Sequence, residues 1–208
     1  MVHYKLTYFK SRGYAEAIRQ VFHLAGVPFE DVRLEHGAEW EEFKPKTPFG
    51  HAPVLSVDGF QIPQSTAILR YVARKYGYAG KTPEEEAWVD AIVDQFKDFI
   101  HSYGQLIFAT RQNKPAEEIE RIRVEVANPA RDTFLKIIIG ILEKSKSGFL
   151  VGESVTFADL VITETFYTFD KNEFYKKEDY PKLAEHMTKI QNLPKLKEWI
   201  ATRPDTQF

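Results

Sequence analysis

The sequence predicts a small α/β domain followed by an all-helical domain. Strand patterns, with apolar residues at every second position, occur only in the first 80 residues. From Lys81 onward the apolar residues recur at helical spacing instead. A chain of 208 residues has room for one or two domains on general size grounds. We therefore expect domains at 1–80 and 81–208, joined by a short linker at about 78–81.

The elements of the first domain follow from apolar periodicity and from turn residues. Strands are expected at 2–9, 28–34, 53–57 and 60–62, the last two joined by the turn Asp58-Gly59. Helical spacing covers 14–25 and 65–76, and a glycine follows each of these segments. Between them, 40–44 predicts one irregular helical turn, since Pro45 and Pro48 prevent a longer helix. The resulting order, βαβ, loop, ββα, is that of a thioredoxin-like module.

The second domain is expected to contain helices only. Thr82-Pro83 begins the first helix, because a capping threonine and a proline at the first helical position precede acidic residues. Helical periodicity then runs to about residue 110, and it returns over 115–144, 181–191 and 194–202. After a compact apolar loop at 148–152, Thr156 and Asp159 form a variant capping box that opens a helix to about Phe169.

Composition and charge exclude several classes of protein. The chain has 28 Lys and Arg against 30 Asp and Glu, for a formal net charge of −2. A nucleic-acid-binding protein would need a basic surplus, so we expect no nucleic-acid partner. No stretch approaches the length of about 18 uncharged apolar residues that a membrane span requires, and the N-terminus lacks the apolar run of a signal peptide. We therefore expect a cytoplasmic protein without a membrane partner.

The chain contains no cysteine. This absence excludes a thiol nucleophile, disulfides, thiolate metal sites and a C-x-x-C redox pair. Any sulfur chemistry must therefore use a sulfur that the substrate brings. The six histidines show no metal-ligand spacing, so we expect no metal site.

Five short motifs lie in register along almost the whole chain. They are the segment Tyr4–Phe9, Arg12-Gly13, the segment 52–55, Gln64-Ser65 and the segment from Gly152 to Asp159. Together they resemble cytosolic glutathione transferases, most closely the sigma-like members of nematodes, to which haematopoietic prostaglandin D synthases are related. The resemblance implies a homodimeric enzyme that uses glutathione as cosubstrate, without a metal, and conjugates its thiolate to small hydrophobic electrophiles for detoxification.

Tyr8 lies at the end of the first predicted strand, where a side chain can project into a cleft. On its own it would be expected to pack half-buried on the surface, but the resemblance implies that its hydroxyl is catalytic. Lowering a thiol pKa by two units from about 8.5 needs about 2.7 kcal/mol, and a hydrogen bond to a charged group supplies roughly 1.5–3 kcal/mol. The N-terminus of the next helix, near 12–14, adds its dipole. Ser11 is the alternative, because other classes of this fold use a serine in this loop.

The resemblance assigns glutathione contacts to two further segments. The first consists of Gly50, His51, Ala52 and Pro53. It implies a cis-proline that turns the main chain of Ala52 outward, toward the peptide backbone of glutathione. The second segment, Gln64-Ser65, stands where a polar residue often only caps a helix. The implied function is binding of the γ-glutamyl carboxylate at the helix N-terminus.

Two groups of polar residues complete the implied glutathione site. Trp40 and Lys44 share one face of a helical turn and would hold the glycyl end, unless they merely cover the surface. Asp90, Asp94 and Asp98 follow at intervals of four residues in the first helix of the second domain. We expect Asp90 and Asp94 to be simply solvated. The resemblance implies that Asp98 reaches across a dimer interface toward the glutathione amino group of the other subunit.

The chain departs from the family pattern at several positions. Tyr14 stands where relatives often have a second arginine, which leaves Arg12 as the only arginine near Tyr8 in the sequence. Lys97 and Gln105 stand where prostaglandin D synthases have an aspartate and a tryptophan. From aromatic content and placement, the electrophile is expected near four residues, namely Tyr14, Tyr103, Phe108 and Phe208.

Three other functions stay open at this point. Nematode relatives suggest a carrier of haem or other flat apolar ligands, which an aromatic content of 14% permits. A glutathione-dependent prostaglandin isomerase is the second alternative. The third is a structural protein such as a lens crystallin, against which the complete set of Tyr8, Gln64-Ser65, Trp40 and Lys44 argues.

Overall fold

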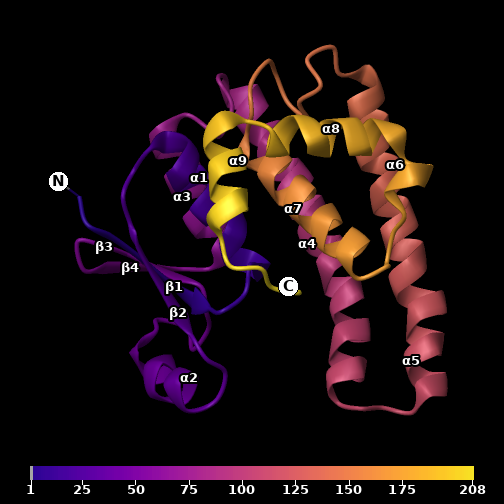
Figure 1. Ribbon diagram of the computed structural model, residues 1–208, viewed down its shortest axis with the longest axis horizontal. Helices are drawn as coiled ribbons and strands as arrows, with labels where there is room; N and C mark the ends of the chain where they lie inside the picture. Colours follow the sequence, from indigo (N-terminus) through magenta and orange to yellow (C-terminus); the bar gives the residue numbers. More distant parts are fainter. Residues whose placement is uncertain (1) are drawn as a thin grey trace.

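A computed structural model describes residues 2–208 and confirms a thioredoxin-like α/β domain followed by helices (Figure 1). Its four-stranded sheet contains β1 (Tyr4–Phe9), β2 (Glu30–Leu34), β3 (Val54–Val57) and β4 (Phe60–Pro63), in the order β2-β1-β3-β4. The central strand β1 is parallel to β2 and antiparallel to β3. The first strand is shorter than predicted, because His3 pairs with the turn residue Asp58 through two hydrogen bonds of 2.8 and 3.0 Å.

Two helices cover the sheet of the first domain. They are α1 (Glu16–Ala25), which a 3-10 turn η1 (Gly13–Ala15) precedes, and α3 (Ser65–Tyr76). Each ends at a glycine in the left-handed conformation, as the sequence predicts. The buried faces of α1 and α3 meet Leu6 and Leu55 of the sheet through Ile18, Phe22 and Ile68, all fully buried. The short α2 (Ala38–Phe43) and the 3-10 turn η2 (Lys44–Lys46) lie outside this core.

The regular elements of the second domain are helices in the described part of the chain. It contains α4 (Pro83–Arg111), α5 (Ala116–Ile122), α6 (Asn128–Lys144), α7 (Phe157–Lys171), the 3-10 turn η4 (Lys177–Asp179), α8 (Pro181–Gln191) and α9 (Pro194–Thr202). The single helix expected at 115–144 is interrupted by a π-helical turn, η3 (Arg123–Ala127). Pro129 explains the interruption, because its ring has no N–H and excludes the regular bond to residue 125. Among the described residues, no helix combines the length and the apolarity needed to cross a bilayer.

Helix α7 is the centre of the second domain and joins it to the first. It contacts α1, α3, α4 and α8, and most of its residues are buried (Figure 1). The backbone N–H of Phe157 donates to Tyr78 O in the linker at 2.8 Å. The capping box at its start is confirmed, since the Asp159 carboxylate accepts from Thr156 N at 2.7 Å. The same carboxylate accepts from Leu150 N at 2.8 Å and so fastens the apolar loop 148–152 to the helix.

Replacement of Asp159 by alanine should therefore destabilise the whole fold. The change removes the acceptor of three buried hydrogen bonds, so we expect a loss of about 2–4 kcal/mol in the free energy of unfolding. Urea denaturation followed by circular dichroism measures this loss. Thr82→Ala is the matched control, because that helix cap is exposed and its loss should cost only about 1 kcal/mol. Equal effects of the two changes would contradict the special importance of Asp159.

Candidate active site

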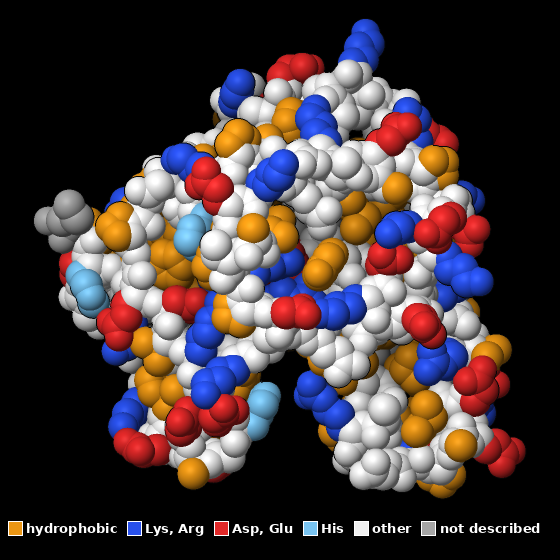
Figure 2. Space-filling view, in the orientation of Figure 1, with side chains coloured by type: hydrophobic (Ala, Val, Ile, Leu, Met, Phe, Trp, Pro, Cys, Tyr) orange, Lys and Arg blue, Asp and Glu red, His pale blue; other side chains and the backbone are white. Residues whose placement is uncertain are grey.

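A cavity of about 420 Å³ lies between the two domains. One wall comes from β1, η1 and the start of α3, and the other from α4, α7 and the C-terminal Phe208. Figure 2 shows the molecule hollowed between the lobe that carries α2 and the lower ends of α4 and α5, with cationic side chains and a histidine near the notch. The cavity therefore has an α/β side with polar groups and a helical side that is mostly apolar.

Tyr8 projects from β1 into this cavity and is 7% exposed. Its hydroxyl accepts a hydrogen bond of 3.3 Å from the backbone N–H of Tyr14 in the turn η1. The chain passes so close that a Cβ at Gly13 would stand 2.6 Å from Tyr8 Oη, and the φ of Gly13 is +37°. A glycine is therefore needed beside this hydroxyl.

The electrostatic setting keeps the Tyr8 hydroxyl protonated. Burial raises the pKa of Tyr8 above its ordinary value of 10.0, and the Tyr14 N–H and the Arg19 charge oppose this rise only in part. At neutral pH the side chain is thus a hydroxyl that accepts one hydrogen bond from the backbone and retains a proton to donate. Such a group can stabilise an anion in the cavity.

Ala52 and Ser65 line the same cavity as Tyr8. The peptide bond between Ala52 and Pro53 is cis, as the resemblance implies. Gln64 has a φ of +71° and its side chain makes no capping bond to α3, so the interpretation of Gln64 as a helix cap is wrong. The first N–H groups of α3 are therefore left without a side-chain cap. A helix start of this kind can bind an anion.

The other implied glutathione contacts lie outside the cavity lining. Trp40 packs edge-on against Phe9, with ring centroids 5.2 Å apart, and Phe9 itself lines the cavity. Lys44 is exposed and begins η2, and a Cβ at Gly50 would lie 3.9 Å from its Cε. His51, Pro53 and Gln64 also fall outside the lining. The structure thus brings Tyr8, Ala52 and Ser65 together in the cavity lining and leaves the other implied glutathione contacts outside it.

The expectation that Asp90 and Asp94 are merely solvated is wrong. Arg70 of α3 binds both, with distances of 2.7 Å to Asp90 and 2.8 Å to Asp94, and Arg74 also reaches Asp90 at 3.3 Å. The reason is that both acids share one face of α4 opposite two arginines of α3 with the same spacing. The hydrogen bond from Arg70 lowers the pKa of Asp94. Asp98, one turn further, is exposed and has no cation within 4.0 Å among residues 2–208.

Three of the four residues expected near the electrophile lie in the cavity lining. Tyr14, Tyr103 and Phe208 line the cavity, whereas Phe108 is 60% exposed and does not. Tyr103 and Phe108 are five residues apart, which turns their side chains about 140° from each other around the axis of α4. The expectation for Phe108 is therefore wrong. Lys97, where prostaglandin D synthases have an aspartate, lies 3.6 Å from Asp94.

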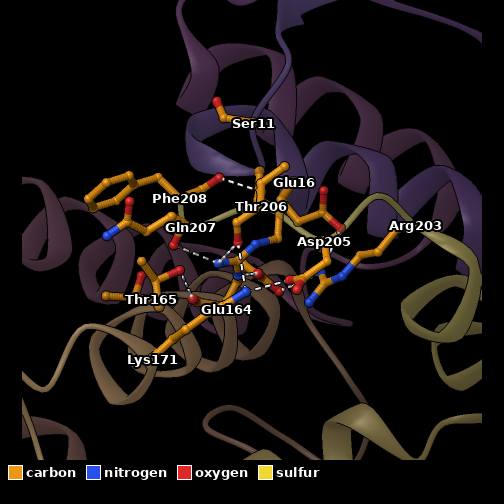
Figure 3. A network of polar contacts seen from close by, with 12 residues as sticks. Ser11, Glu16, Glu164, Thr165, Lys171, Arg203, Asp205, Thr206, Gln207 and Phe208 are labelled. Atoms are coloured by element: carbon orange, nitrogen blue, oxygen red, sulfur yellow. Dashed lines mark hydrogen bonds and ion pairs between the residues drawn. The ribbon is translucent and has the colours of Figure 1, made fainter.

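A buried ion network holds the C-terminal tail against this cavity (Figure 3). Arg12 is 2% exposed and forms an ion pair with Glu164 of α7. Glu164 also accepts from Gln20 and from Arg203, both at 2.9 Å. Arg12 is therefore a structural residue in this chain and makes no contact with the Tyr8 hydroxyl. One signal for this network was present in the sequence, because Glu164 interrupts an otherwise uncharged run at 160–169.

The tail residues after α9 bind the same arginine. The backbone N–H of Arg12 donates to Phe208 O at 2.7 Å, and its guanidinium donates to Gln207 O at 3.1 Å. Lys171 pairs with Asp205 from the opposite side. These contacts direct the Phe208 ring into the cavity, and Figure 3 shows the tail lying between α7 and the first domain.

Comparison with known proteins gives a consistent result over the whole chain. Residues 4–74 match the family model of the glutathione S-transferase N-terminal domain, and residues 97–203 match that of the C-terminal domain. Glutathione S-transferase 3 of Caenorhabditis elegans is 49% identical over 208 residues, covering 100% of both chains.

Solved structures of similar proteins agree in fold. A Nu-class GST from Haemonchus contortus matches with a TM-score of 0.91 and 49% identity over 100% of both chains. Monomeric Na-GST-3 from Necator americanus gives a TM-score of 0.91 and 47% identity, covering 99% of this chain and 100% of its own. Rat hPGDS complexed with a quinoline gives a TM-score of 0.87 and 33% identity, covering 99% of this chain and 100% of its own.

The buried network predicts a large cost for the loss of its acid. In Glu164→Ala the buried guanidinium of Arg12 loses its carboxylate partner, so the free energy of unfolding should fall by about 3–5 kcal/mol. Chemical denaturation measures this change. Asp205→Asn breaks an exposed ion pair of the same tail and should cost less than about 1 kcal/mol. A loss of similar size in both variants would show that burial of the pair is unimportant.

Proposed function

The chain belongs to the glutathione S-transferase family, and we propose that it conjugates the thiolate of reduced glutathione to hydrophobic electrophiles in detoxification. The observation that carries this proposal is the protonated Tyr8 hydroxyl at one wall of a cavity whose opposite wall is apolar. This arrangement suits a thiol that must ionise next to an apolar reaction partner. We further propose a sigma-like enzyme of the cytoplasm, with the likeness to rat hPGDS as support for the subclass.

Tyr8 donates its proton in a hydrogen bond to the glutathione sulfur and so stabilises the thiolate. Its oxygen already accepts from Tyr14 N–H, and a hydroxyl that accepts one hydrogen bond donates another more strongly. A charge-assisted hydrogen bond of roughly 1.5–3 kcal/mol accounts for a decrease of about one to two units in the thiol pKa. The thiolate then attacks the electrophile, and Tyr8 keeps its own proton throughout.

Residues 1–80 supply the glutathione site in this proposal. Ala52 pairs with the peptide backbone of glutathione through its main chain, and the open N-terminus of α3 at Gln64-Ser65 binds the γ-glutamyl carboxylate. Trp40 and Lys44 hold the glycyl end, and the neighbouring backbone of Gly50, His51 and Pro53 completes the site. Residues 81–208 supply the electrophile site along α4, with Tyr103 and Phe208 as aromatic walls.

We also propose that two copies of the chain pair, with Asp98 of each directed at the glutathione amino group of the other. Asp98 is exposed and has no cation within 4.0 Å in the described part of the chain. Phe49 and Trp88 are 61% and 53% exposed, so two large apolar side chains are available to pack against a second copy. Na-GST-3 is described as monomeric, so the oligomeric state of this chain must be measured directly.

The proposed activity is tested by glutathione-agarose retention followed by conjugation of a generic aryl halide. The protein should bind the resin, elute with free glutathione and turn over the halide above the uncatalysed rate. Retention without turnover would favour a carrier of apolar ligands. Failure of both would overturn the assignment of an active glutathione transferase.

The Tyr8→Phe variant should conjugate more slowly than the wild type but bind glutathione with similar affinity. The ring and its packing remain, but the donor to the thiolate is lost, so the conjugation rate should fall about 10- to 150-fold. The pKa of bound glutathione, measured from thiolate absorbance, should rise by about one to two units. Because burial raises the Tyr8 pKa, the wild-type rate should show no loss from tyrosine ionisation up to about pH 9. An unchanged profile in the variant would leave Ser11 as the candidate hydroxyl.

The dimer proposal has its own test. Sedimentation at micromolar concentration should show a species of twice the 24.1 kDa chain mass, and Asp98→Ala should raise the Kd for glutathione without loss of thermal stability. Asp94→Ala is the matched control, because Asp94 is paired with Arg70 within the chain and should leave that Kd unchanged. A single monomeric species with full glutathione affinity would contradict both the dimer and the function of Asp98.

A further inference from the structure

We propose that Arg111 makes this enzyme selective for apolar electrophiles that carry a carboxylate or a similar anionic group. The inference rests on the proposed conjugation activity and names the substrate class of the same cavity. Helix α4 presents one face to the cavity. Val93, Phe96, Ile100 and Ile107 line the cavity at helical spacing, and Arg111 ends the series in the last turn.

This face forms an apolar stripe with one cation at its end. Arg111 lies 18 positions after Val93, which corresponds to about 27 Å of helix at 1.5 Å per residue. An elongated electrophile lying on the stripe would place its apolar body against Phe96 and Ile100, and a polar end group at Arg111. A flexible, exposed guanidinium at this position can adapt to acceptors of different length.

Two other charged groups of the cavity wall already have partners within the chain. Besides Arg111, the lining contains the Glu164 carboxylate and the chain terminus at Phe208. Glu164 is satisfied by Arg12, Gln20 and Arg203. The carbonyl oxygen of Phe208 accepts from Arg12 N and from Thr206 Oγ1, both at 2.7 Å. Both groups are therefore already hydrogen-bonded within the chain.

Arg111 differs from these groups because it has no acidic partner. Within residues 2–208, no carboxylate oxygen lies within 4.0 Å of its guanidinium nitrogens. Neighbouring cations do have partners, since Lys114 binds Glu118 at 2.6 Å and Arg123 binds Glu120 at 3.3 Å. Arg111 also acts on the reaction centre from a distance, because its charge lowers the pKa of Tyr8 against the effect of burial.

The chemistry explains why such a cation would be useful. An anionic electrophile must approach a bound thiolate, and two negative charges repel each other in a mostly apolar cavity. A positive charge that contacts the anionic end of the electrophile offsets this repulsion and also orients the reacting carbon. A neutral electrophile gains neither effect. The change in the ratio of the rates for the anionic and the neutral electrophile, when Arg111 is substituted, therefore reports on Arg111.

Ethacrynic acid and its methyl ester are a matched pair of probes. Both contain the same aryl vinyl ketone, and only the acid has a charged oxyacetate group. In either case the glutathione sulfur forms a bond to the terminal vinyl carbon, the π electrons shift to the carbonyl oxygen, and the resulting enolate takes a proton from water. No atom leaves and no redox partner is needed.

We expect Arg111→Gln to lower kcat/KM for the acid relative to the ester by about 2- to 5-fold, the range of an exposed ion pair. Arg111→Lys should restore most of the ratio, and Arg111→Glu should lower it further. Arg121→Gln is the control, because Arg121 lies on α5 outside the cavity and should leave the ratio at the wild-type value.

Two results would overturn the inference, and they differ from a failure of the conjugation activity itself. If the ester is turned over normally and the ratio does not change in Arg111→Gln, Arg111 does not select anionic electrophiles. If the KM for glutathione rises equally with both probes, Arg111 binds a carboxylate of glutathione instead. If the wild-type protein converts neither probe, the proposed conjugation fails, and the inference that rests on it fails too.

Discussion

The buried carboxylate of Glu164 is the interaction on which the arrangement of this molecule depends. It stands in the middle of α7 and pairs with Arg12 from the first domain and Arg203 from the segment after α9. Burial of a carboxylate and two guanidiniums costs several kcal/mol unless the charges are paired with one another. The pairing therefore specifies one relative position for the α/β domain, the helical core and the tail.

The same network reaches Tyr8 through the backbone. Arg12 is held by Glu164, and the next residues are Gly13, which passes against the Tyr8 ring, and Tyr14, whose N–H meets the Tyr8 hydroxyl. A structural ion pair at residue 12 thus positions the donor at residue 14. The hydrogen bond that orients the Tyr8 hydroxyl therefore comes from the backbone and not from an arginine side chain.

The cavity itself separates two kinds of recognition. On the α/β side the groups are backbone amides and small polar side chains such as Ser65, which suit one invariant peptide-like cosubstrate. On the helical side most of the wall consists of aliphatic and aromatic residues that tolerate many shapes. Because the chain has no cysteine, the reactive sulfur must enter with the cosubstrate, and the protein contributes position and electrostatics only.

The sequence alone determined the order of the strands, most of the helix ends and the family. Local patterns suffice for these, because alternation, helical spacing and the Thr156–Asp159 box act between residues a few positions apart. It also identified Tyr8, Ala52 and Ser65, which meet in one cavity. Only the tertiary structure decided which charges are paired. Asp90 and Asp94 bind arginines 16 to 24 residues away, and Arg12 binds Glu164 at a separation of 152 residues. Partners so distant leave no periodic signal, because their proximity is created by the packing of whole helices.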